Sequence, residues 1–239
     1  MPHKWPGALV RGRLLERPNR FLGIVELGDG SVVEAHIADR GRLEAILFPG
    51  AEVHLARVTG AKRRTAFTLL LARSGEVLVC IDPAGANRLV GVLLERGLLD
   101  LPPYVSFRQE VKVERSRFDF GLELEGGGRL LLEVKSAGAS DGEAALFPDA
   151  PSERAARHCL ELAELARQGE AAAIVMVAQR GDARAIRPHP VDPVFAAALA
   201  AAKDAGVLLR GVGFDVGLGG FEYLGPLPIL VDGGLGDRG

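Results

Sequence analysis

A β-hairpin is predicted by residues 110–136, which read EVKVERSRFDFGLELEGGGRLLLEVKS. Hydrophobic and polar residues alternate on both sides of three consecutive glycines, as they do in two half-buried strands joined by a turn. Successive side chains of a strand point to opposite faces, so Glu133 and Lys135, two positions apart, share one face. If the two strands of the hairpin pair in a register that puts both polar faces on one side of the sheet, Asp119 lies beside Glu133 and Lys135. The hairpin therefore predicts a cluster of two carboxylates and a lysine.

The alternation also predicts how each strand is oriented. The first strand is expected to run over 111–124 in one piece, and the second starts at 130 and continues through 134. Arg117 and Asp119 are expected on one face of the first strand, and three apolar side chains on the other. These three are Phe118, Phe120 and Leu122.

An acid–acid–lysine cluster suits metal-dependent hydrolysis of phosphodiesters. Magnesium prefers a few carboxylate oxygens together with waters and phosphate oxygens. A positioned ammonium can orient the attacking water and offset charge on the phosphate, while the metal acts as a Lewis acid. The alternative is an ordinary set of cross-strand ion pairs, each stabilising a sheet by about 0.2 to 1 kcal/mol. The sequence pattern, an acid on the first strand and Glu-x-Lys on the second, is compatible with both a metal site and a set of ion pairs.

Length and composition predict a globular protein of one or two domains. The chain has 239 residues, of which 48% are hydrophobic and 25% charged, close to the averages for folded proteins. Its apolar runs are too short to cross a bilayer and its N-terminus lacks a signal-peptide pattern, so we expect a cytoplasmic protein without membrane contact. Cys80 and Cys159 have no C-x-x-C or histidine spacing, which favours buried free thiols over a disulfide or a zinc site.

The first eighty residues predict a small β-barrel. Short apolar segments are separated by turn signals such as Gly28-Asp29-Gly30 and Pro49-Gly50, with little sign of helix. A five-stranded barrel of the oligonucleotide-binding (OB) type matches this size and presents a face and loops to a nucleic acid strand. The expected strands are 9–16, 21–27, 32–37, 53–59, 65–72 and 77–81.

The charge distribution fits a binding module joined to a metal site. Residues 1–83 contain twelve Lys and Arg against nine Asp and Glu, whereas the remainder contains seventeen against twenty-two. In the first part, Lys62, Arg63 and Arg64 lie in an expected hairpin loop, and Arg20 is one of the arginines spaced along the first expected strands. They are candidate phosphate contacts, and the alternative is a solvated basic turn that keeps a sheet edge soluble.

The second half predicts an α/β domain. Asn87 is the expected N-cap of a helix over 88–96, and a polar loop over 137–145 is expected to be mobile. Ser152 is expected to introduce a helix that extends to about Gln168. Further on, 171–178 is an apolar strand covered on both faces, 195–205 is a helix, and 207–209 starts another strand. The glycine-rich segment after 217 is expected to fray beyond 230.

Arg154 and His158 are candidate phosphate-binding or proton-relaying groups. They share one face of the predicted 152–168 helix with Glu161, at i, i+4 and i+7. A cation and an imidazole beside an acidic hairpin suit both roles. The alternative is a solvated helix face with intrahelical ion pairs.

The chain resembles members of the sugar fermentation stimulation protein A family. The resemblance covers nearly the whole chain in the right order, with Ser152 where the family usually has threonine and Ala155 where it usually has glycine. The motifs are Arg20-Phe21, His36…Asp39-x-Gly41-Arg42-Leu43, Pro49-Gly50, Ala86-Asn87-Arg88-Leu89, Glu110-Val111, Ser116-Arg117-Phe118-Asp119-Phe120, Glu133-Val134-Lys135-Ser136 and Phe147-Pro148-Asp149-Ala150…Arg154…His158.

The resemblance implies a two-domain α/β protein. An OB-type barrel that binds nucleic acid would occupy 1–83, and a mixed-sheet domain similar to the PD-(D/E)xK nuclease superfamily would occupy 84–230. A flexible tail would follow over 231–239. Asp119, Glu133 and Lys135 match the superfamily signature. Members of the family are described as DNA-binding and were long regarded as regulators of sugar metabolism.

These expectations combine into a first hypothesis, a nuclease that depends on Mg²⁺ or Mn²⁺. Asp119 and Glu133 would ligate the metal with help from the Val134 carbonyl, Lys135 would position the water, and Glu110 would be an auxiliary acid. The expected nucleic-acid contacts are Arg20, Lys62, Arg63, Arg64, Asn87, Arg88, Arg117, Arg154 and His158. Of these, Arg117, Arg154 and His158 would hold the scissile phosphate.

The expected partner is DNA, with RNA as an alternative. A second hypothesis is a DNA-binding or regulatory protein that does not cleave, built on a nuclease-like scaffold. A third, a small-molecule enzyme of sugar metabolism, has no support, because the sequence contains neither a glycine-rich dinucleotide fingerprint nor a P-loop.

Overall fold

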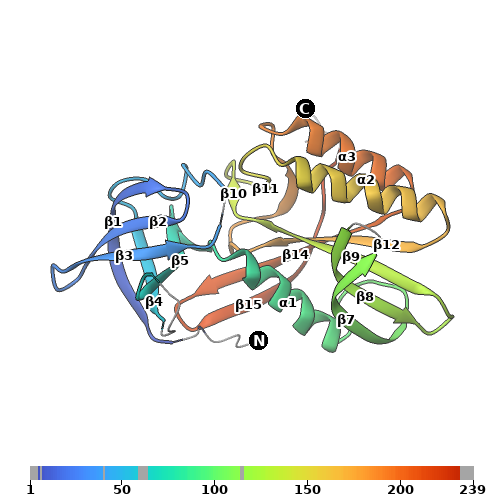
Figure 1. Cartoon of the computed structure of the whole chain (residues 1–239), viewed down its shortest axis with the longest axis horizontal. Helices are drawn as coiled ribbons and strands as arrows, with labels where there is room; N and C mark the ends of the chain where they lie inside the picture. Colours follow the sequence, from blue (N-terminus) through green and yellow to red (C-terminus); the bar gives the residue numbers. More distant parts are fainter. Residues whose placement is uncertain (1–4, 6, 40, 59–63, 114–115, 232–239) are drawn as a thin grey trace.

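The N-terminal part is a closed five-stranded barrel. The computed structural model describes residues 5, 7–39, 41–58, 64–113 and 116–231 (Figure 1). Within the barrel, β1 pairs antiparallel with β2 and β4, β2 with β3, and β4 with β5, and a parallel β3–β5 pairing closes the ring. The strands are β1 (Leu9–Asn19), β2 (Leu22–Leu27), β3 (Val32–Ile37), β4 (Glu52–Arg57) and β5 (Phe67–Ser74), and β6 (Val77–Cys80) extends the sheet from β5. The predicted barrel is confirmed.

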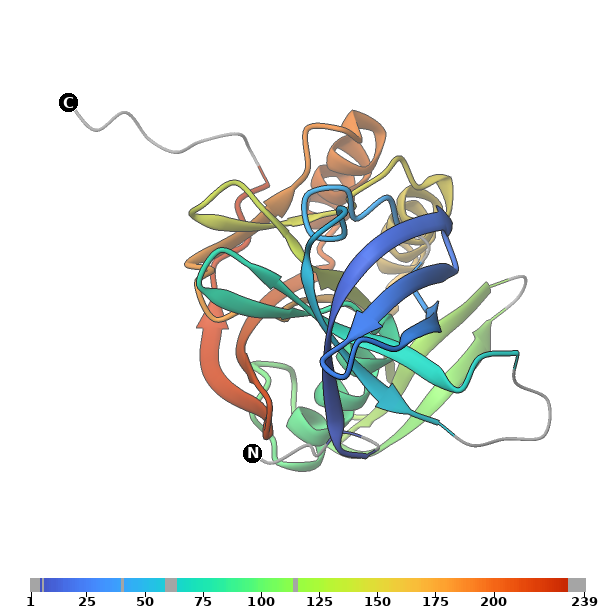
Figure 2. The ribbon, with the colours of Figure 1, turned by 90° about the vertical axis from the view of Figure 1, so that its left-hand side faces the viewer.

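Alternation explains the barrel core. Inward side chains such as Leu14, Val25, Ile37 and Leu69 are fully buried. Figure 2 shows the barrel strands, in blue to cyan, crossing one another. The long strand β1 pairs with both β2 and β4, and Gly12 takes part in both pairings. A Cβ atom there would stand 2.9 Å from the Glu26 carbonyl and would overlap the Val25 side chain. Glycine therefore allows β1 to curve closely over β2.

The second part is a six-stranded mixed sheet, in the order β15-β14-β12-β9-β8-β7, with helices on both faces. The three central strands β9, β12 and β14 are mutually parallel. In Figure 1, α1 lies on one face and α2 and α3 on the other. The elements are α1 (Pro83–Glu95), β7 (Tyr104–Val113), β8 (Ser116–Leu124), β9 (Arg129–Ala137), α2 (Glu153–Arg167), β12 (Ala171–Ala178), α3 (Pro193–Asp204), β14 (Leu208–Gly217) and β15 (Gly220–Leu227).

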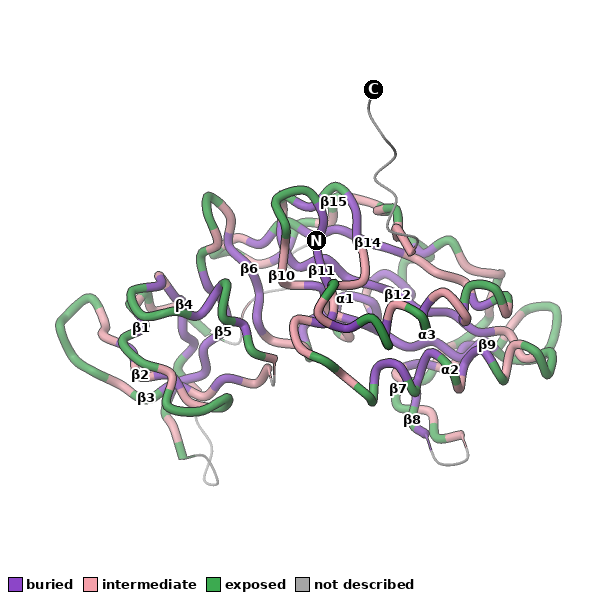
Figure 3. The backbone as a smooth tube through the Cα atoms, turned by 90° about the horizontal axis from the view of Figure 1, so that it is seen from above, coloured by how far each residue is buried: buried purple, intermediate pink, exposed green. Residues whose placement is uncertain are grey.

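Two apolar cores result from alternation along the central strands. On β12, Val175 packs with the α1 side and Ile174 with the α2–α3 side, and both are fully buried. The expected strand over 171–178 is therefore confirmed, covered on both faces. Figure 3 shows the buried central strands in purple and the exposed edges in green.

Helix α1 begins one turn earlier than predicted. Its N-cap is Asp82, whose Oδ1 accepts a hydrogen bond from Ala84 N at 3.1 Å, and Pro83 follows at the first position. The expected cap at Asn87 is wrong, because Asp-Pro is itself a strong helix start. Asn87 lies inside the helix, where its side chain is free for another contact. The helix introduced by Ser152 is confirmed as α2, with Ser152 Oγ accepting from Ala155 N at 3.2 Å.

The predicted single strand over 111–124 is two strands. β7 ends at Val113 and β8 begins at Ser116, and the two pair antiparallel so that Val111 lies opposite Phe118. Period-2 alternation is the same in one long strand and in two strands of a tight hairpin, so the pattern did not distinguish them.

Two segments in which no strand was predicted contain strands. The loop over 137–145 contains β10 (Ala139–Ser140), and with β11 (Ala144–Phe147) and β13 (Ala185–Pro188) it forms a small three-stranded sheet. The segment after 217 forms β15, because it pairs with β14 and buries Phe221 against Trp5, with ring centroids 4.8 Å apart.

The expected tail lies outside the described residues except for Val231. The division of the chain into independent units at residue 83 stays a prediction. Among the described residues, no helix is long and apolar enough to cross a membrane.

Candidate active site

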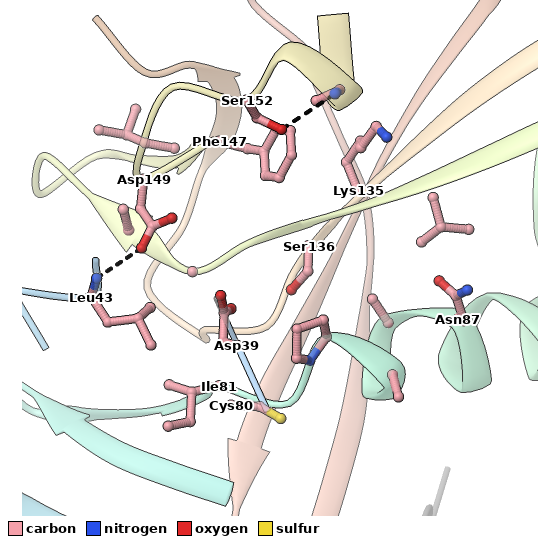
Figure 4. A pocket seen from close by; sticks show the side chains of 18 of the residues that line it. Asp39, Leu43, Cys80, Ile81, Asn87, Lys135, Ser136, Phe147, Asp149 and Ser152 are labelled. Atoms are coloured by element: carbon pink, nitrogen blue, oxygen red, sulfur yellow. Dashed lines mark hydrogen bonds between the residues drawn. The ribbon is translucent and has the colours of Figure 1, made fainter. Parts of the chain in front are cut away.

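A cavity of about 350 Å³ lies between the barrel and the mixed sheet. Its walls come from β9, from the first turns of α1 and α2, and from the barrel loop that follows β3. Figure 4 shows Lys135 and Asn87 on one side of the cavity and Asp39 and Asp149 on the other. Asp119, Glu133 and Lys135 all line this cavity.

Asp119 occupies the place where β8 and β9 separate. The pairing of these strands ends at Phe120 opposite Leu132. Beyond it, Asp119 Oδ2 accepts a hydrogen bond from Val134 N at 2.8 Å, and Oδ1 accepts one from Asn87 Nδ2 at 2.7 Å. Burial, followed by the negative charge of Glu133, raises the pKa of Asp119 against these two hydrogen bonds. The carboxylate is therefore fixed at the end of the strand pair and faces the cavity.

Glu133 is the most deeply buried acid of the site, with 4% of its surface exposed. Its Oε1 accepts hydrogen bonds from Lys135 Nζ at 2.7 Å and from His158 Nδ1 at 2.6 Å. Burial acts to raise the pKa of Glu133, but the His158 hydrogen bond and the Lys135 charge together outweigh it and lower the pKa. Its Oε2 is also buried and has no hydrogen-bond partner among the described residues.

The donor set fits a hard divalent cation. The described residues contain no cluster of three His, Cys, Asp or Glu side chains that could hold a metal. Mg²⁺, however, keeps several waters and binds through one or two carboxylates, which Asp119 and Glu133 supply. The unpartnered Oε2 of Glu133 is the oxygen that a cation would satisfy. Cys80 also lines the cavity, but burial raises the pKa of its thiol to about 12, so it is protonated and unsuited to a thiolate site.

The predicted residues do not all meet at this cavity. Arg154, in the first turn of α2, lines it, and its guanidinium has no hydrogen bond or ion pair with any described residue. His158 is buried behind Glu133 with its ring edge-on to Phe118, at 5.9 Å between centroids. Glu110 and Arg117 are largely exposed, lie 3.6 Å apart as an ion pair, and do not line the cavity.

The expected common face of Phe118 and Phe120 is wrong. Phe118 packs in the core on the α2–α3 side, whereas Phe120 and Leu122 pack on the α1 side. The change of side falls at Asp119, where β8 leaves its pairing with β9. A strand that is bent at one residue no longer keeps alternation across it.

The remaining predicted contacts lie elsewhere. Asn87 is engaged with Asp119, and Arg88 Nη2 donates to Asp82 Oδ2 at 2.7 Å. Arg64 lines a second hollow on the barrel surface together with Phe21 and His36. Arg20 lies in the turn beside this hollow, and its carbonyl accepts from Arg17 Nη2 at 3.1 Å. Lys62 and Arg63 fall outside the described residues.

Sequence reasoning missed two acids of the cavity, Asp39 and Asp149. Asp39, from the barrel, accepts a hydrogen bond from Gly41 N at 2.7 Å; burial raises its pKa to about 6, and the nearby Asp149 adds to the shift. Asp149, from the segment before α2, accepts from Leu43 N at 2.9 Å. Both acids stand in motifs of the family resemblance, but no sequence spacing indicates that Leu43 and Asp149, which are 106 positions apart, meet.

The fold and the site define a two-part protein, an OB-type barrel joined to an α/β domain with a buried acid–acid–lysine site between them. Comparison with known proteins agrees. The family model described as "SfsA N-terminal OB domain" matches residues 15–81, and "Sugar fermentation stimulation protein RE domain" matches residues 84–220. The chain belongs to the sugar fermentation stimulation protein family.

Two relatives and one solved structure show how close the similarity is. A sugar fermentation stimulation protein homolog of Desulforamulus reducens is 36% identical over 212 residues, covering 88% of this chain and 87% of the relative. One of Acetivibrio thermocellus is 39% identical over 204 residues, covering 84% and 87%. The structure of Pyrococcus furiosus SfsA in complex with Ca²⁺ superposes with a TM-score of 0.82 at 30% identity, covering 96% of this chain and 98% of that one.

Proposed function

We propose that this protein is a divalent-metal-dependent nuclease that acts on DNA. One observation carries the proposal: Glu133 is buried and one of its carboxylate oxygens has no hydrogen-bond partner among the described residues, at a cavity that also contains Asp119 and Lys135. A structural ion pair would satisfy both carboxylate oxygens from the protein, because an unpaired buried oxygen is destabilising by about 1 to 3 kcal/mol. A carboxylate oxygen left unpaired in a residue that lines a cavity is the arrangement expected of a cation ligand.

Each side chain of the site has a role in this chemistry. Asp119 and Glu133 would hold Mg²⁺ or Mn²⁺, with the Val134 carbonyl as a third oxygen. The cation, when bound, would polarise the phosphate and lower the pKa of a bound water. Lys135 would orient the attacking water and offset negative charge on the phosphate. Asn87 would keep Asp119 in position, and we reassign His158 from phosphate binding to holding Glu133.

Arg154 is the proposed phosphate ligand. It lies in the first turn of α2, where backbone N–H groups and the helix dipole also favour an anion. It is exposed and unpaired among the described residues, so binding would break no existing ion pair. Glu110 and Arg117 have no part in this proposal, because their side chains do not line the cavity.

The hollow on the barrel is the proposed DNA-binding surface. Phe21 is 48% exposed there, which makes its ring available for stacking on a base. Arg64 and Arg20 would contact phosphates, together with Lys62 and Arg63, which precede Arg64 in the sequence and lie outside the described residues. In this proposal residues 1–83 bind the strand and residues 84–230 cleave it.

The related Pyrococcus furiosus protein, described in complex with Ca²⁺, supports divalent-cation binding. Mg²⁺ or Mn²⁺ as the working cofactor is our proposal, since both accept the oxygen ligands present here.

The test is cleavage of end-labelled single- and double-stranded DNA and RNA by the full chain, with Mg²⁺ or Mn²⁺. Asp119→Asn and Glu133→Gln should abolish cleavage and preserve DNA binding. Glu123→Gln is the matched control, because Glu123 is an exposed carboxylate of β8 that pairs with Arg108 away from the cavity. Wild-type protein that binds DNA but cuts nothing with either metal would instead be a DNA-binding protein on a nuclease-like scaffold.

A further inference from the structure

The reactive groups are reached only through the cavity. Glu133 and Lys135 are 4% and 7% exposed, so a phosphate that meets them must enter the 350 Å³ space rather than touch an open surface. Small-molecule sites span about 300 to 1,000 Å³, and this cavity is at the lower end of that range. It has room for about one nucleotide unit.

The wall opposite Glu133 belongs to the barrel and is held in place. Leu43 N donates to Asp149 Oδ2, and Gly41 packs directly against the Asp149 carboxylate, so that a Cβ there would overlap it. Arg17 holds the same loop from the barrel side through the carbonyls of Gly41 and Arg42. Contacts from both parts of the molecule therefore fix the loop that bounds the cavity.

Charge is divided across the cavity. Lys135 and Arg154 line the side formed by β9 and α2 together with the proposed metal ligands Asp119 and Glu133, so a phosphate would be favoured there when a cation offsets the two carboxylates. Asp39 and Asp149 lie on the opposite side (Figure 4), where carboxylates repel phosphate but accept hydrogen bonds from sugar hydroxyl and base N–H groups. Leu43, Ile46 and Phe147 add apolar surface for a base.

We propose that this cavity receives a single unpaired nucleotide of a single-stranded nucleic acid, with its phosphate at Lys135 and Arg154 and its sugar and base against the barrel loop at Asp39. The inference rests on the proposed function and specifies its substrate. A base inside a continuous duplex is stacked on both sides and paired to a second strand, whereas this cavity of about 350 Å³ is bounded on one side by the barrel loop. An unpaired nucleotide enters without disrupting a duplex.

The test is fluorescence anisotropy of the full chain with labelled 12-nucleotide single strands and the corresponding blunt duplex, in Ca²⁺. The single strand is expected to bind at least tenfold more tightly than the duplex. Ala84→Trp, on the exposed first turn of α1 at the cavity wall, should weaken single-strand binding at least tenfold by filling the space. Ala197→Trp, at an exposed position of α3, is the matched control and should have no effect.

A second measurement tests the orientation of the nucleotide. Asp39→Asn keeps the turn to Gly41 but removes the charge that repels phosphate, so single-strand affinity should be retained or rise while kcat falls at least threefold. The matched control is Asp29→Asn, because Asp29 makes the same kind of turn with Ser31 N on the far β2–β3 connection. Equal kcat in Asp39→Asn and wild type would overturn the role of Asp39.

The outcomes separate the two proposals. Equal binding of duplex and single strand, or an unaffected Ala84→Trp variant, would overturn the single-strand inference while leaving metal-dependent cleavage intact. A protein that binds neither probe would contradict the proposed function and, with it, the inference.

Discussion

His158 Nδ1 lies 2.6 Å from Glu133 Oε1, so the histidine that the sequence placed on a phosphate-binding helix face stands behind the buried acid of the site. The contact joins α2 to the central strand β9. It engages one carboxylate oxygen, while the second oxygen, Oε2, has no partner among the described residues.

His158→Phe should therefore weaken metal binding. The substitution fills the buried space but removes the hydrogen bond that lowers the pKa of Glu133 and orients it. Loss of such a supporting partner typically reduces metal affinity by about 10- to 100-fold. Isothermal titration with Mn²⁺ measures the effect. His36→Phe on the barrel is the control, and equal affinity in both variants would show that His158 does not support the metal site.

Asn87→Leu should impair the metal site more than DNA binding. The sequence placed Asn87 among the nucleic-acid contacts, whereas its side chain donates to Asp119 Oδ1 at 2.7 Å. Without that donor, Asp119 keeps only its hydrogen bond from Val134 N and loses orientation. We expect Mn²⁺ affinity to fall about tenfold, while DNA affinity in metal-free buffer changes less than twofold. The reverse pattern would restore Asn87 as a DNA contact.

Asp39→Asn should stabilise the protein at high pH but not at low pH. Burial raises the folded-state pKa of Asp39 from 3.8 to about 6, so the folded protein takes up this proton more readily than the unfolded chain. The resulting stabilisation is complete below about pH 4 and is lost as the pH rises through about 6. At pH 8 the asparagine variant, which carries no charge, should unfold with a free energy higher by about 1 to 3 kcal/mol. Urea unfolding at pH 4 and pH 8 measures this difference. Equal differences at both pH values would contradict the assignment.

Gly41→Ala and Asp149→Ala should both destabilise the contact between the barrel loop at residues 41–43 and Asp149. The first forces a Cβ into the Asp149 carboxylate, and the second leaves Leu43 N without its acceptor. We expect each to lower the free energy of unfolding by about 1 to 3 kcal/mol. Because the two residues touch, the double variant should lose less than the sum of the single losses. Additive losses in thermal unfolding would show that the two positions act independently.

Phe21→Ala should weaken DNA binding without changing the metal site. The ring lines the barrel hollow, and stacking on one base contributes about 1 to 3 kcal/mol, or roughly 5- to 150-fold in affinity. Phe48→Ala is a close control, because Phe48 is equally exposed on the barrel, at 49% against 48%, but lies outside the hollow. If both variants bind DNA like wild type, the hollow is not the binding surface.

Much of the architecture followed from local pattern. Short alternating strands with turn signals predicted the barrel, and the unbroken apolar run of 171–178 predicted a central strand, because burial on one or both faces leaves its mark directly on the order of residues. Glu133 and Lys135 were paired correctly for the same reason, since residues two apart on a strand always share a face.

Local pattern failed where the chain bends or where distant segments meet. Alternation continued through the β7–β8 turn and hid it, and it misplaced Phe118 because β8 changes sides at Asp119. No spacing linked Asp39 and Leu43 of the barrel to Asp149, or His158 to Glu133. The sequence was enough to place Glu133 and Lys135 on one face of a strand, but not to find Asp39 and Asp149. Only tertiary packing encloses these residues in a cavity, leaves Glu133 Oε2 without a partner among the described residues and places a barrel loop at the cavity wall. These features depend on contacts between segments that no sequence periodicity connects.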